Sequence, residues 1–298
     1  MEIYVIVVTY KGGQWYEKCF SSLRNSSIPI HIVAIDNASG DNTVEYIRLN
    51  FPEVHIFESD TNLGFGRANN IGLKYALEHN CDYVFLLNQD AWVEQDSIEK
   101  LVHVHLSHPD YGIVSPMHLT GDGSHLNFLI DGKGRMLDII SDLYLGDHKD
   151  LYPINYVNAA AWLLPRSTLM TIGGFCPIIF HYGEDDDYLN RAKFHKLKVG
   201  LCPDSRIYHD TKKRLTEGVV LFKKANSEKI HEYLDINKSF YHLAYRRKML
   251  VKALKYKLRK KDAAASACIH TYRFLKKNHK RIEECRQQHM ISQPSWLN

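Results

Sequence analysis

The sequence predicts an α/β protein, in which a mostly parallel sheet is flanked by helices and followed by a basic helical C-terminal region. Apolar runs alternate with segments of helical spacing in the N-terminal part, and a polar cluster follows each run. The charge is also divided unevenly, because residues 211–298 contain 22 Lys and Arg against 7 Asp and Glu. That region therefore has a net charge of +15, whereas residues 1–210 have −11. We expect two regions, residues 1–210 and residues 211–298.

The N-terminal part has the pattern of repeated strand–helix units. Four apolar runs predict strands, at residues 3–8, 31–35, 54–58 and 83–87. Three segments between them predict helices, at residues 14–24, 41–50 with Asp41 as N-cap, and 66–79. Alternating strands and helices form parallel sheets, and ligands bind such sheets beyond the carboxyl ends of the strands. Polar clusters lie at these ends, at residues 9–13, 36–40, 60–67 and 88–90.

The rest of the chain is less regular. Residues 121–150 predict a loop-rich insertion, and residues 157–164 form a buried segment of undetermined type. A helix over 184–196 and a late strand ending at His209 follow. Beyond residue 227 the pattern is helical, with an apolar face and a last helix capped by Asp262. That face is expected to comprise Phe240, Leu243, Leu250, Leu254 and Leu258.

The composition excludes several classes of protein. With 298 residues, 45% of them hydrophobic, the chain is neither disordered nor collagen-like. Its six cysteines lie far apart and include no Cys-x-x-Cys, so we expect reduced thiols in the core rather than a zinc ribbon. Glu2 does not suit a signal peptide, and no run approaches the roughly 18 apolar residues of a membrane span. These features predict a soluble, cytoplasmic protein.

Three features could carry chemistry, and each has a simpler explanation. Asp90 follows a buried strand, where a carboxylate suits a hard divalent cation, although it could be an ordinary turn residue. Residues 184–187 are four consecutive carboxylates, which need a cation, backbone amides or Arg partners, or simply form an acidic first helical turn. His209 ends a strand, and a lone histidine is more often structural than a metal ligand.

One glycine-containing segment imitates a dinucleotide-binding fingerprint. In residues 62–70, Gly64 and Gly66 have the first spacing of that motif, but Asn69 occupies the position of the third glycine. The segment also follows the third strand rather than the first. A nicotinamide-dependent dehydrogenase is therefore not expected.

Taken in order, the motifs of residues 1–210 resemble glycosyltransferase family 2, most closely bacterial rhamnosyltransferase-like enzymes of surface polysaccharide synthesis. The resemblance rests on six motifs and His209: Val7–Tyr10, Val33–Ser39, Asn62–Gly66, Leu86–Asp90, Gly173–Phe175 and Gly183–Asp187. It implies a GT-A fold, which is Rossmann-like, and inverting transfer of one sugar from a UDP- or dTDP-type nucleotide sugar. A hydroxyl group of a glycan or lipid-linked glycan is the implied acceptor.

The resemblance also implies roles for individual residues. Thr9, Tyr10 and Asp36 would bind the nucleoside, and Asp60, Asn62 and Arg67 would lie in the following donor loop. Asp90 matches the last residue of the family's Asp-x-Asp metal motif, and His209 aligns with a histidine that completes the metal shell in some relatives. The implied cofactor is Mg²⁺ or Mn²⁺. Asp185 matches the base that deprotonates the acceptor, and Glu184 would support that base or touch the acceptor.

Three positions depart from the family pattern. Asn88 replaces the first Asp of the metal motif, Cys176 follows Gly-Gly-Phe where Asp is usual, and Asn158-Ala159 replaces Gly-Ala. A sugar nucleotidyltransferase is an alternative, but Thr9–Gly13 supplies little of the phosphate loop that it needs. A non-catalytic nucleotide-sugar-binding protein is the other alternative, which Asn88 leaves open.

The basic region 211–298 has three explanations. Its charges could lie on solvated helical faces packed against the rest of the chain. They could instead hold the protein at the anionic inner face of the membrane, which would suit a lipid-linked acceptor. Nucleic acid binding is the third explanation, but no motif supports it, and we expect no nucleic acid partner. The oligomeric state cannot be deduced from these features.

Overall fold

The computed structural model describes residues 1–127, 133–211, 230–239 and 241–297. Its N-terminal half follows the strand–helix alternation expected from the sequence. The elements are β1 (Ile3–Thr9), α1 (Gly13–Arg24), β2 (His31–Asp36), α2 (Thr43–Asn50), β3 (His55–Glu58), α3 (Phe65–Glu78) and β4 (Tyr83–Asn88). The predicted strands and helices of this part are confirmed to within two residues. Asp41 precedes α2 by two residues and accepts a hydrogen bond from the Thr43 amide at 3.0 Å, so it is not the N-cap.

The second half contains shorter strands and additional helices. These are β5 (Ala91–Val93), α4 (Ser97–Ser107), β6 (Tyr111–Thr120), α5 (Lys133–Leu145), β7 (Tyr152–Ile154), β8 (Ala161–Pro165), α6 (Arg166–Ile172), α7 (Glu184–Phe194) and β9 (Lys198–His209). The loop-rich insertion expected at 121–150 is wrong in part, because α5 occupies its centre. Gly134 and Gly146 lie at the two ends of that helix and obscured the helical spacing between them.

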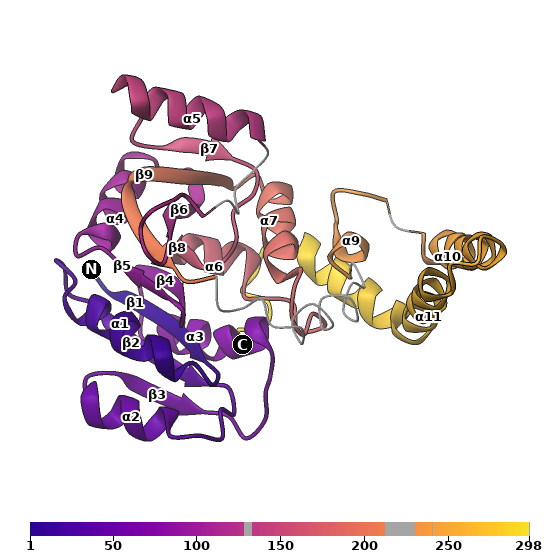
Figure 1. Cartoon of the computed structure of the whole chain (residues 1–298), viewed down its shortest axis with the longest axis horizontal. Helices are drawn as coiled ribbons and strands as arrows, with labels where there is room; N and C mark the ends of the chain where they lie inside the picture. The colour runs from indigo at the N-terminus through magenta and orange to yellow at the C-terminus, as the bar shows by residue number, and fades with distance from the viewer. Residues whose placement is uncertain (128–132, 212–229, 240, 298) are drawn as a thin grey trace.

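The strands form one mixed sheet with the order β3-β2-β1-β4-β8-β6-β9-β5, and β7 pairs with β9. The first four strands are parallel, as are β6 and β9, whereas β8 is antiparallel to both β4 and β6. Figure 1 shows the sheet with helices on both sides. Alternate residues of β1 contribute to two cores, one shared with α1, α2 and α4 and the other with α3, α6 and α7.

The C-terminal region forms helices that extend from the sheet. They are α9 (Ile230–Leu234), α10 (His242–Leu258) and α11 (Asp262–Met290). In Figure 1, α11 runs outward from α7, and α10 lies beside its far end. Asp262 is the first residue of α11 rather than its cap, which is Lys261. Among the residues described, no helix combines enough length and apolar character to cross a bilayer.

The apolar face expected on α10 is wrong, because the side chains expected to pack are exposed. Leu243, Leu250, Leu254 and Leu258 are each at least 41% exposed, and Phe240 lies outside the described residues. The face against α11 instead contains buried Ala253 and the partly buried side chains of Tyr245, Met249 and Tyr256. The long leucines therefore lie on the outer side of α10.

The end of α11 and the last residues of the chain pack against residues 170–190. Leu275, Ile282 and Cys285 form a cluster with Cys176 and Ile179. Beyond α11, the Ser295 carbonyl accepts a hydrogen bond from the Gly174 amide at 2.9 Å, and Leu297 enters the core of the sheet. The predicted division between residues 1–210 and 211–298 remains a prediction, and residues 212–229 beside it lie outside the described residues.

Candidate active site

The parallel register brings the carboxyl ends of β1, β2 and β4 to one edge of the sheet. Thr9 pairs with Asp36 of β2, and Val8 pairs with Asn88 of β4. Residues 9–10, 36–39 and 88–90 therefore meet in space although they are far apart in the sequence. The polar clusters lie where the strand pattern places them.

Asp36 organises the loop that follows β2. Its carboxylate accepts hydrogen bonds from the Thr9 hydroxyl at 3.2 Å, from the Ser39 hydroxyl and from the Ser39 amide at 3.1 Å. The side chain is buried, and so is Thr9. A carboxylate that receives several donors is held in one orientation. Asp36 and Thr9 thus form a rigid hydrogen-bonded surface. The Lys11 amide also donates a hydrogen bond to the Ser39 hydroxyl beside it.

Two asparagines join the loops that follow β2 and β3. Asn37 accepts a hydrogen bond from the Leu63 amide at 2.7 Å and donates one to Asn62 at 3.1 Å, and Asn62 also accepts from the Gly64 amide. Gly64 has a φ of 80°, and a Cβ at this position would collide with the Phe180 carbonyl. Only glycine therefore suits the junction. Asn62 positions this loop, a role that the family resemblance does not specify.

The remaining donor-loop candidates differ in exposure. Tyr10 has a side chain that is 40% exposed, while its backbone is held by Gln89, which accepts from its amide at 2.8 Å and donates to its carbonyl at 3.0 Å. Arg67 is partly buried and donates from Nε to the Leu63 carbonyl. Asp60 is exposed in the same region. The sequence analysis did not identify Gln89 as a site residue. Its side chain also packs closely against Gly12, where a Cβ would collide with it.

Asp90 and His209 meet in the interior. Nε2 of His209 lies 3.4 Å from Oδ1 of Asp90, and the side chains are 1% and 0% exposed. Among the described residues, neither ring nitrogen of His209 has a hydrogen-bond partner. Buried charges are normally paired or bound to metal ions. A carboxylate and an imidazole with unused nitrogens fit the donor set of a divalent cation, and Mn²⁺ accepts imidazole more readily than Mg²⁺ does.

A second buried histidine adjoins this pair. The ring of His118, on β6, lies 6.4 Å from that of His209, and its Nε2 lies 3.1 Å from the Ser115 hydroxyl. Burial, with a smaller contribution from His209, lowers the pKa of His118 to about 3. Its ring is therefore neutral at neutral pH. No motif in the sequence distinguished His118, because only the pairing of β6 with β9 brings it to His209.

The four carboxylates that begin α7 point to different partners. Glu184 lies 3.4 Å from Nδ1 of His181, and Asp185 accepts a hydrogen bond from the Ala159 amide at 3.2 Å. Asp187 forms an ion pair with Arg191 at 3.0 Å. All four occupy the first turn of the helix, whose dipole favours negative charge. The cluster is therefore an acidic first helical turn, and its carboxylates also have separate partners. The two explanations given for it in the sequence are compatible.

Asp185 has a raised pKa. Burial is the largest cause, and the neighbouring Glu184 charge raises the pKa further, while the Ala159 amide opposes the shift. A raised pKa makes the carboxylate a stronger base, which suits Asp185 to accept a proton.

Backbone contacts connect the Asp90 and Asp185 regions. The Asn88 amide donates to the Ala160 carbonyl at 2.9 Å, and the adjoining Ala159 amide donates to Asp185. The segment just before β8 therefore lies between the end of β4 and the start of α7. The sequence left residues 157–164 without an assigned structure, yet this segment holds the two acidic regions together.

Arg191 is a residue that the sequence analysis missed. It is almost fully buried, and besides Asp187 it donates to the carbonyls of Ile172 and Gly174. On the other side of the same turn, Asn70 of α3 bonds both the amide and the carbonyl of Phe175. The Gly-Gly-Phe turn is thus clamped between α3 and α7. An arginine four residues after an aspartate was the only signal in the sequence.

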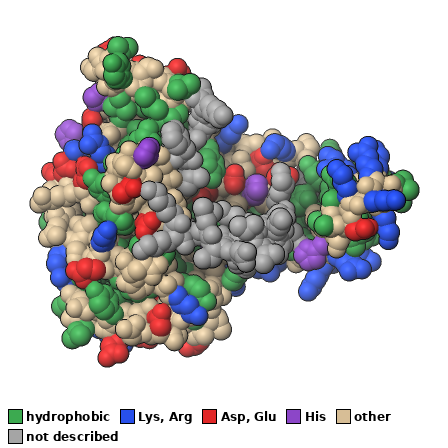
Figure 2. Space-filling model, in the orientation of Figure 1, with side chains coloured by type: hydrophobic (Ala, Val, Ile, Leu, Met, Phe, Trp, Pro, Cys, Tyr) green, Lys and Arg blue, Asp and Glu red, His purple; other side chains and the backbone are tan. Residues whose placement is uncertain are grey.

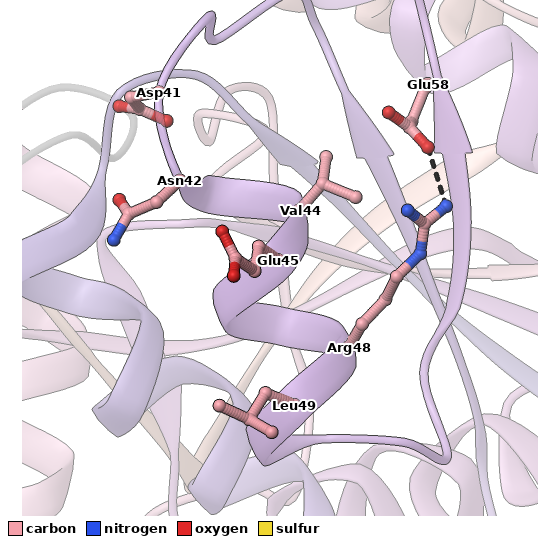
Figure 3. Close-up of a pocket in the computed structure, with 7 residues that line it drawn as sticks. All are labelled: Asp41, Asn42, Val44, Glu45, Arg48, Leu49 and Glu58. Atoms are coloured by element: carbon pink, nitrogen blue, oxygen red, sulfur yellow. Dashed lines mark hydrogen bonds and ion pairs between the residues drawn. The ribbon is translucent and has the colours of Figure 1, made fainter.

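One surface hollow of about 570 Å³ lies away from these residues. Figure 3 shows it on α2 and β3, where Arg48 bonds Glu58. Its lining residues are Asp41, Asn42, Val44, Glu45, Arg48, Leu49 and Glu58. None of the sequence-predicted site residues lines it, so the candidate site is defined by the strand ends and not by this hollow.

The family is shown by comparison with known proteins. The model of the family described as "Glycosyl transferase family 2" matches residues 4–172. The chain belongs to glycosyltransferase family 2. The match contains the strand ends, the Asn62–Gly66 loop and Asp90, and it ends just before the Gly-Gly-Phe turn.

Curated relatives of this family 2 chain act on sugars according to their names. It is 24% identical to "Low-salt glycan biosynthesis hexosyltransferase Agl10" of Haloferax volcanii over 67% of this chain and 64% of that protein. It is 25% identical to the "N-acetylglucosaminyl-diphospho-decaprenol L-rhamnosyltransferase" of Mycobacterium tuberculosis, over 69% of this chain and 75% of the relative. The "dTDP-rhamnosyl transferase RfbF" of Shigella flexneri is 20% identical over 70% and 68%. The chain thus spans slightly less than two thirds of the archaeal relative.

Solved structures identify the fold. The Staphylococcus aureus TarS 1–349 complex with UDP has a TM-score of 0.55 at 13% identity, with 94% of this chain and 92% of that chain covered. The GalNAc-T7 complex with UDP, GalNAc and Mn²⁺ has a TM-score of 0.57 at 16% identity, with 70% and 44% covered. The family 2 domain therefore has the expected GT-A fold, with helices following it.

Proposed function

We propose that the protein is an inverting glycosyltransferase of surface polysaccharide synthesis. It would move one sugar from a UDP- or dTDP-type nucleotide sugar to a hydroxyl group of a glycan or lipid-linked glycan. The observation that carries the proposal is that Asp185 bonds the Ala159 amide, while the adjoining Ala160 carbonyl bonds Asn88, two residues before the buried Asp90–His209 pair. Two of the named relatives are rhamnosyltransferases, and one name specifies a dTDP-type donor.

The donor would bind at the carboxyl ends of β1, β2 and β4. Tyr10 offers an exposed ring against which a nucleobase can pack, and Asp36 with Thr9 forms a hydrogen-bonded polar surface at the neighbouring strand ends. Arg67 and the loop containing Asp60 and Asn62 would border the donor. Asp90 and His209 would hold Mg²⁺ or Mn²⁺, which would supply a Lewis acid for the negative charge of the departing diphosphate.

Asp185 would act as the base. As the bond between the anomeric carbon and the diphosphate oxygen breaks, the acceptor hydroxyl oxygen attacks that carbon from the opposite face. The hydroxyl proton passes to the Asp185 carboxylate, and the nucleoside diphosphate leaves with the bonding electrons. Displacement from the opposite face inverts the anomeric configuration. Glu184, buried beside His181, would hold the start of α7 in place.

A donor panel tests this function. We expect UDP- or dTDP-sugars with Mn²⁺ to raise the melting temperature and to undergo slow hydrolysis, whereas GDP-sugars do neither. The measurements are thermal shift and nucleoside diphosphate release by the full chain. No response to any donor would refute the donor site. Binding of a donor without hydrolysis or transfer would instead favour a non-catalytic nucleotide-sugar-binding protein. The departures from the family pattern at Asn88 and Cys176 would then accompany a loss of catalysis.

A peripheral contact with anionic lipid is a second part of the proposal. On α10, exposed leucines alternate with lysines and arginines, and Figure 2 shows this mixture at the tip of the helical extension. Apolar side chains can enter the boundary between headgroups and acyl chains, and each basic residue near an anionic surface contributes about 1 kcal/mol. A lipid-linked acceptor would make such a contact useful.

Point substitutions on α10 test the lipid contact better than truncation, because α11 and residues 294–297 belong to the packed structure. We expect Leu250→Gln with Leu254→Gln to lower the fraction that sediments with phosphatidylglycerol vesicles. Leu49→Gln, an exposed leucine of α2, is the matched control and should leave sedimentation unchanged. Equal sedimentation of the double variant and the unsubstituted protein would exclude this contact.

A further inference from the structure

A second cluster of metal-binding side chains lies outside the candidate active site, where α11 meets α7. The ligand atoms of Cys176, Asp187 and His289 all lie within 4.8 Å of one another. None of the three residues is more than 2% exposed. Thiol, carboxylate and imidazole groups converging in a dry interior are unusual, because each loses hydration on burial.

A fourth group adjoins the cluster on the same helix as His289. Cys285 precedes His289 by four residues on α11, so both side chains lie on one face of the helix. The Cys176 thiol forms a hydrogen bond with Cys285, and neither cysteine is part of a disulfide. A second sulfur atom, from the C-terminal region, therefore adjoins the sulfur that Cys176 contributes to the cluster.

Asp187 is oriented so that one oxygen faces the cluster. Its Oδ2 is held by Nε of Arg191 at 3.0 Å, and its Oδ1 lies 3.6 Å from Nδ1 of His289. The second distance is too long for a hydrogen bond. Arg191 is itself fixed by the carbonyls of Ile172 and Gly174. A carboxylate whose outer oxygen is fixed in this way resembles the hydrogen-bonded carboxylates of metal sites.

The imidazole of His289 presents a ring nitrogen to the cluster. Among the described residues, neither of its ring nitrogens has a hydrogen bond of normal geometry. The backbone of Leu234 also lies near the ring. Metal-binding histidines commonly place a backbone carbonyl beside the second ring nitrogen.

We propose that Cys176, Cys285, Asp187 and His289 bind one structural Zn²⁺ ion that fastens α11 to α7. Four ligands that include sulfur and nitrogen suit tetrahedral Zn²⁺. The charges also balance, because two thiolates and a carboxylate oppose Zn²⁺ and the Arg191 guanidinium. The site is separate from Asp90 and His209, which include no sulfur, and it does not depend on the proposed function.

The proposal explains a departure from the family pattern. Cys176 stands where family members usually have Asp, and its partners Cys285 and His289 come from the C-terminal region. Asp187 lies two residues after Asp185 on α7. Zn²⁺ at this point would therefore hold the start of α7, together with the Gly-Gly-Phe turn, against the C-terminal helix.

Cobalt substitution tests the site without reference to activity. The full chain, purified with a reducing agent, should contain roughly one Zn²⁺ per molecule by elemental analysis. After exchange, Co²⁺ should give d–d bands of a tetrahedral site and a thiolate-to-cobalt charge-transfer band. The Asp90–His209 pair cannot produce that band, since it has no thiolate. Chelation should also lower the melting temperature, because a structural metal stabilises the folded state.

Variants assign the band to residues. Cys176→Ser, Cys285→Ser and His289→Gln should each weaken or abolish it, whereas Cys268→Ser, on the same helix but outside the cluster, should retain it. A wild-type protein without the thiolate band would overturn the proposal even if the variants fail to fold. A disulfide between Cys176 and Cys285 in protein alkylated directly in cells would also overturn it.

Discussion

Asp185→Asn should lower the rate of sugar transfer by about 100- to 10,000-fold, the range lost when a general base is removed. The asparagine keeps the size of the side chain and can still meet the Ala159 amide through its carbonyl oxygen. It cannot accept the proton of the acceptor hydroxyl. Because the donor binds elsewhere, the affinity for nucleoside diphosphate should remain close to that of the unsubstituted protein. Steady-state transfer and calorimetric binding measure the two quantities separately.

Asp186→Asn is the matched control. Asp186 occupies the same first turn of α7, but its electrostatic partner is His231 rather than Ala159. The two substitutions remove the same charge from the same helix end, so any general effect on the helix dipole is shared. We expect only a small change in the transfer rate for Asp186→Asn. A near-normal rate for Asp185→Asn, or equal losses in the two variants, would contradict the assignment of Asp185 as the base.

Asp90→Asn should remove most of the gain in nucleotide affinity that Mn²⁺ provides. Asp90 contributes the carboxylate of the Asp90–His209 pair, and the preceding Asn88 offers no charge of its own. Loss of a metal ligand is expected to weaken metal-dependent binding by about tenfold to 100-fold. His209→Gln should have a smaller effect in the same direction. Titration of UDP and dTDP by calorimetry, with Mn²⁺ or with EDTA, measures the metal-dependent part.

Asp96→Asn controls for the loss of one carboxylate in this part of the chain. Asp96 forms an ion pair with Lys100 at 2.8 Å on the surface at the start of α4. Exposed pairs of this kind contribute little to stability. The control should therefore retain the full Mn²⁺ effect. If Asp90→Asn also retains it, the ion is not held by Asp90.

Much of the donor edge could be predicted from the sequence. Buried strands of β-branched residues, such as Ile3–Thr9, are recognised by local composition, and a polar cluster at the end of each strand needs no further information. The parallel register then brings Thr9, Asp36 and Asn88 together, because the ends of parallel strands share one edge of the sheet. The family resemblance added the functional meaning of these positions, and the family match confirms the membership.

The second half of the sheet could not be predicted in the same way. The sequence of β8 is a short apolar run, which is equally typical of a buried helix and of a buried strand. Its antiparallel position between β4 and β6 depends on contacts with residues far away in the sequence. The outer face of α10 could not be predicted from the sequence for the same reason. Its leucines have helical spacing, but spacing alone cannot tell which side of a helix meets another helix.

The sequence by itself determined the strand–helix order, the polar strand ends and the opposite charges of the two regions, since these depend on neighbours in the chain. Only the tertiary structure decided how the four acidic groups of α7 divide among Ala159, His181, His231 and Arg191. It also decided that Cys176 and Asp187 meet His289 from the end of α11. The reason is physical: side-chain direction follows from a local period, but a partner distant in the sequence is selected only when the whole core packs.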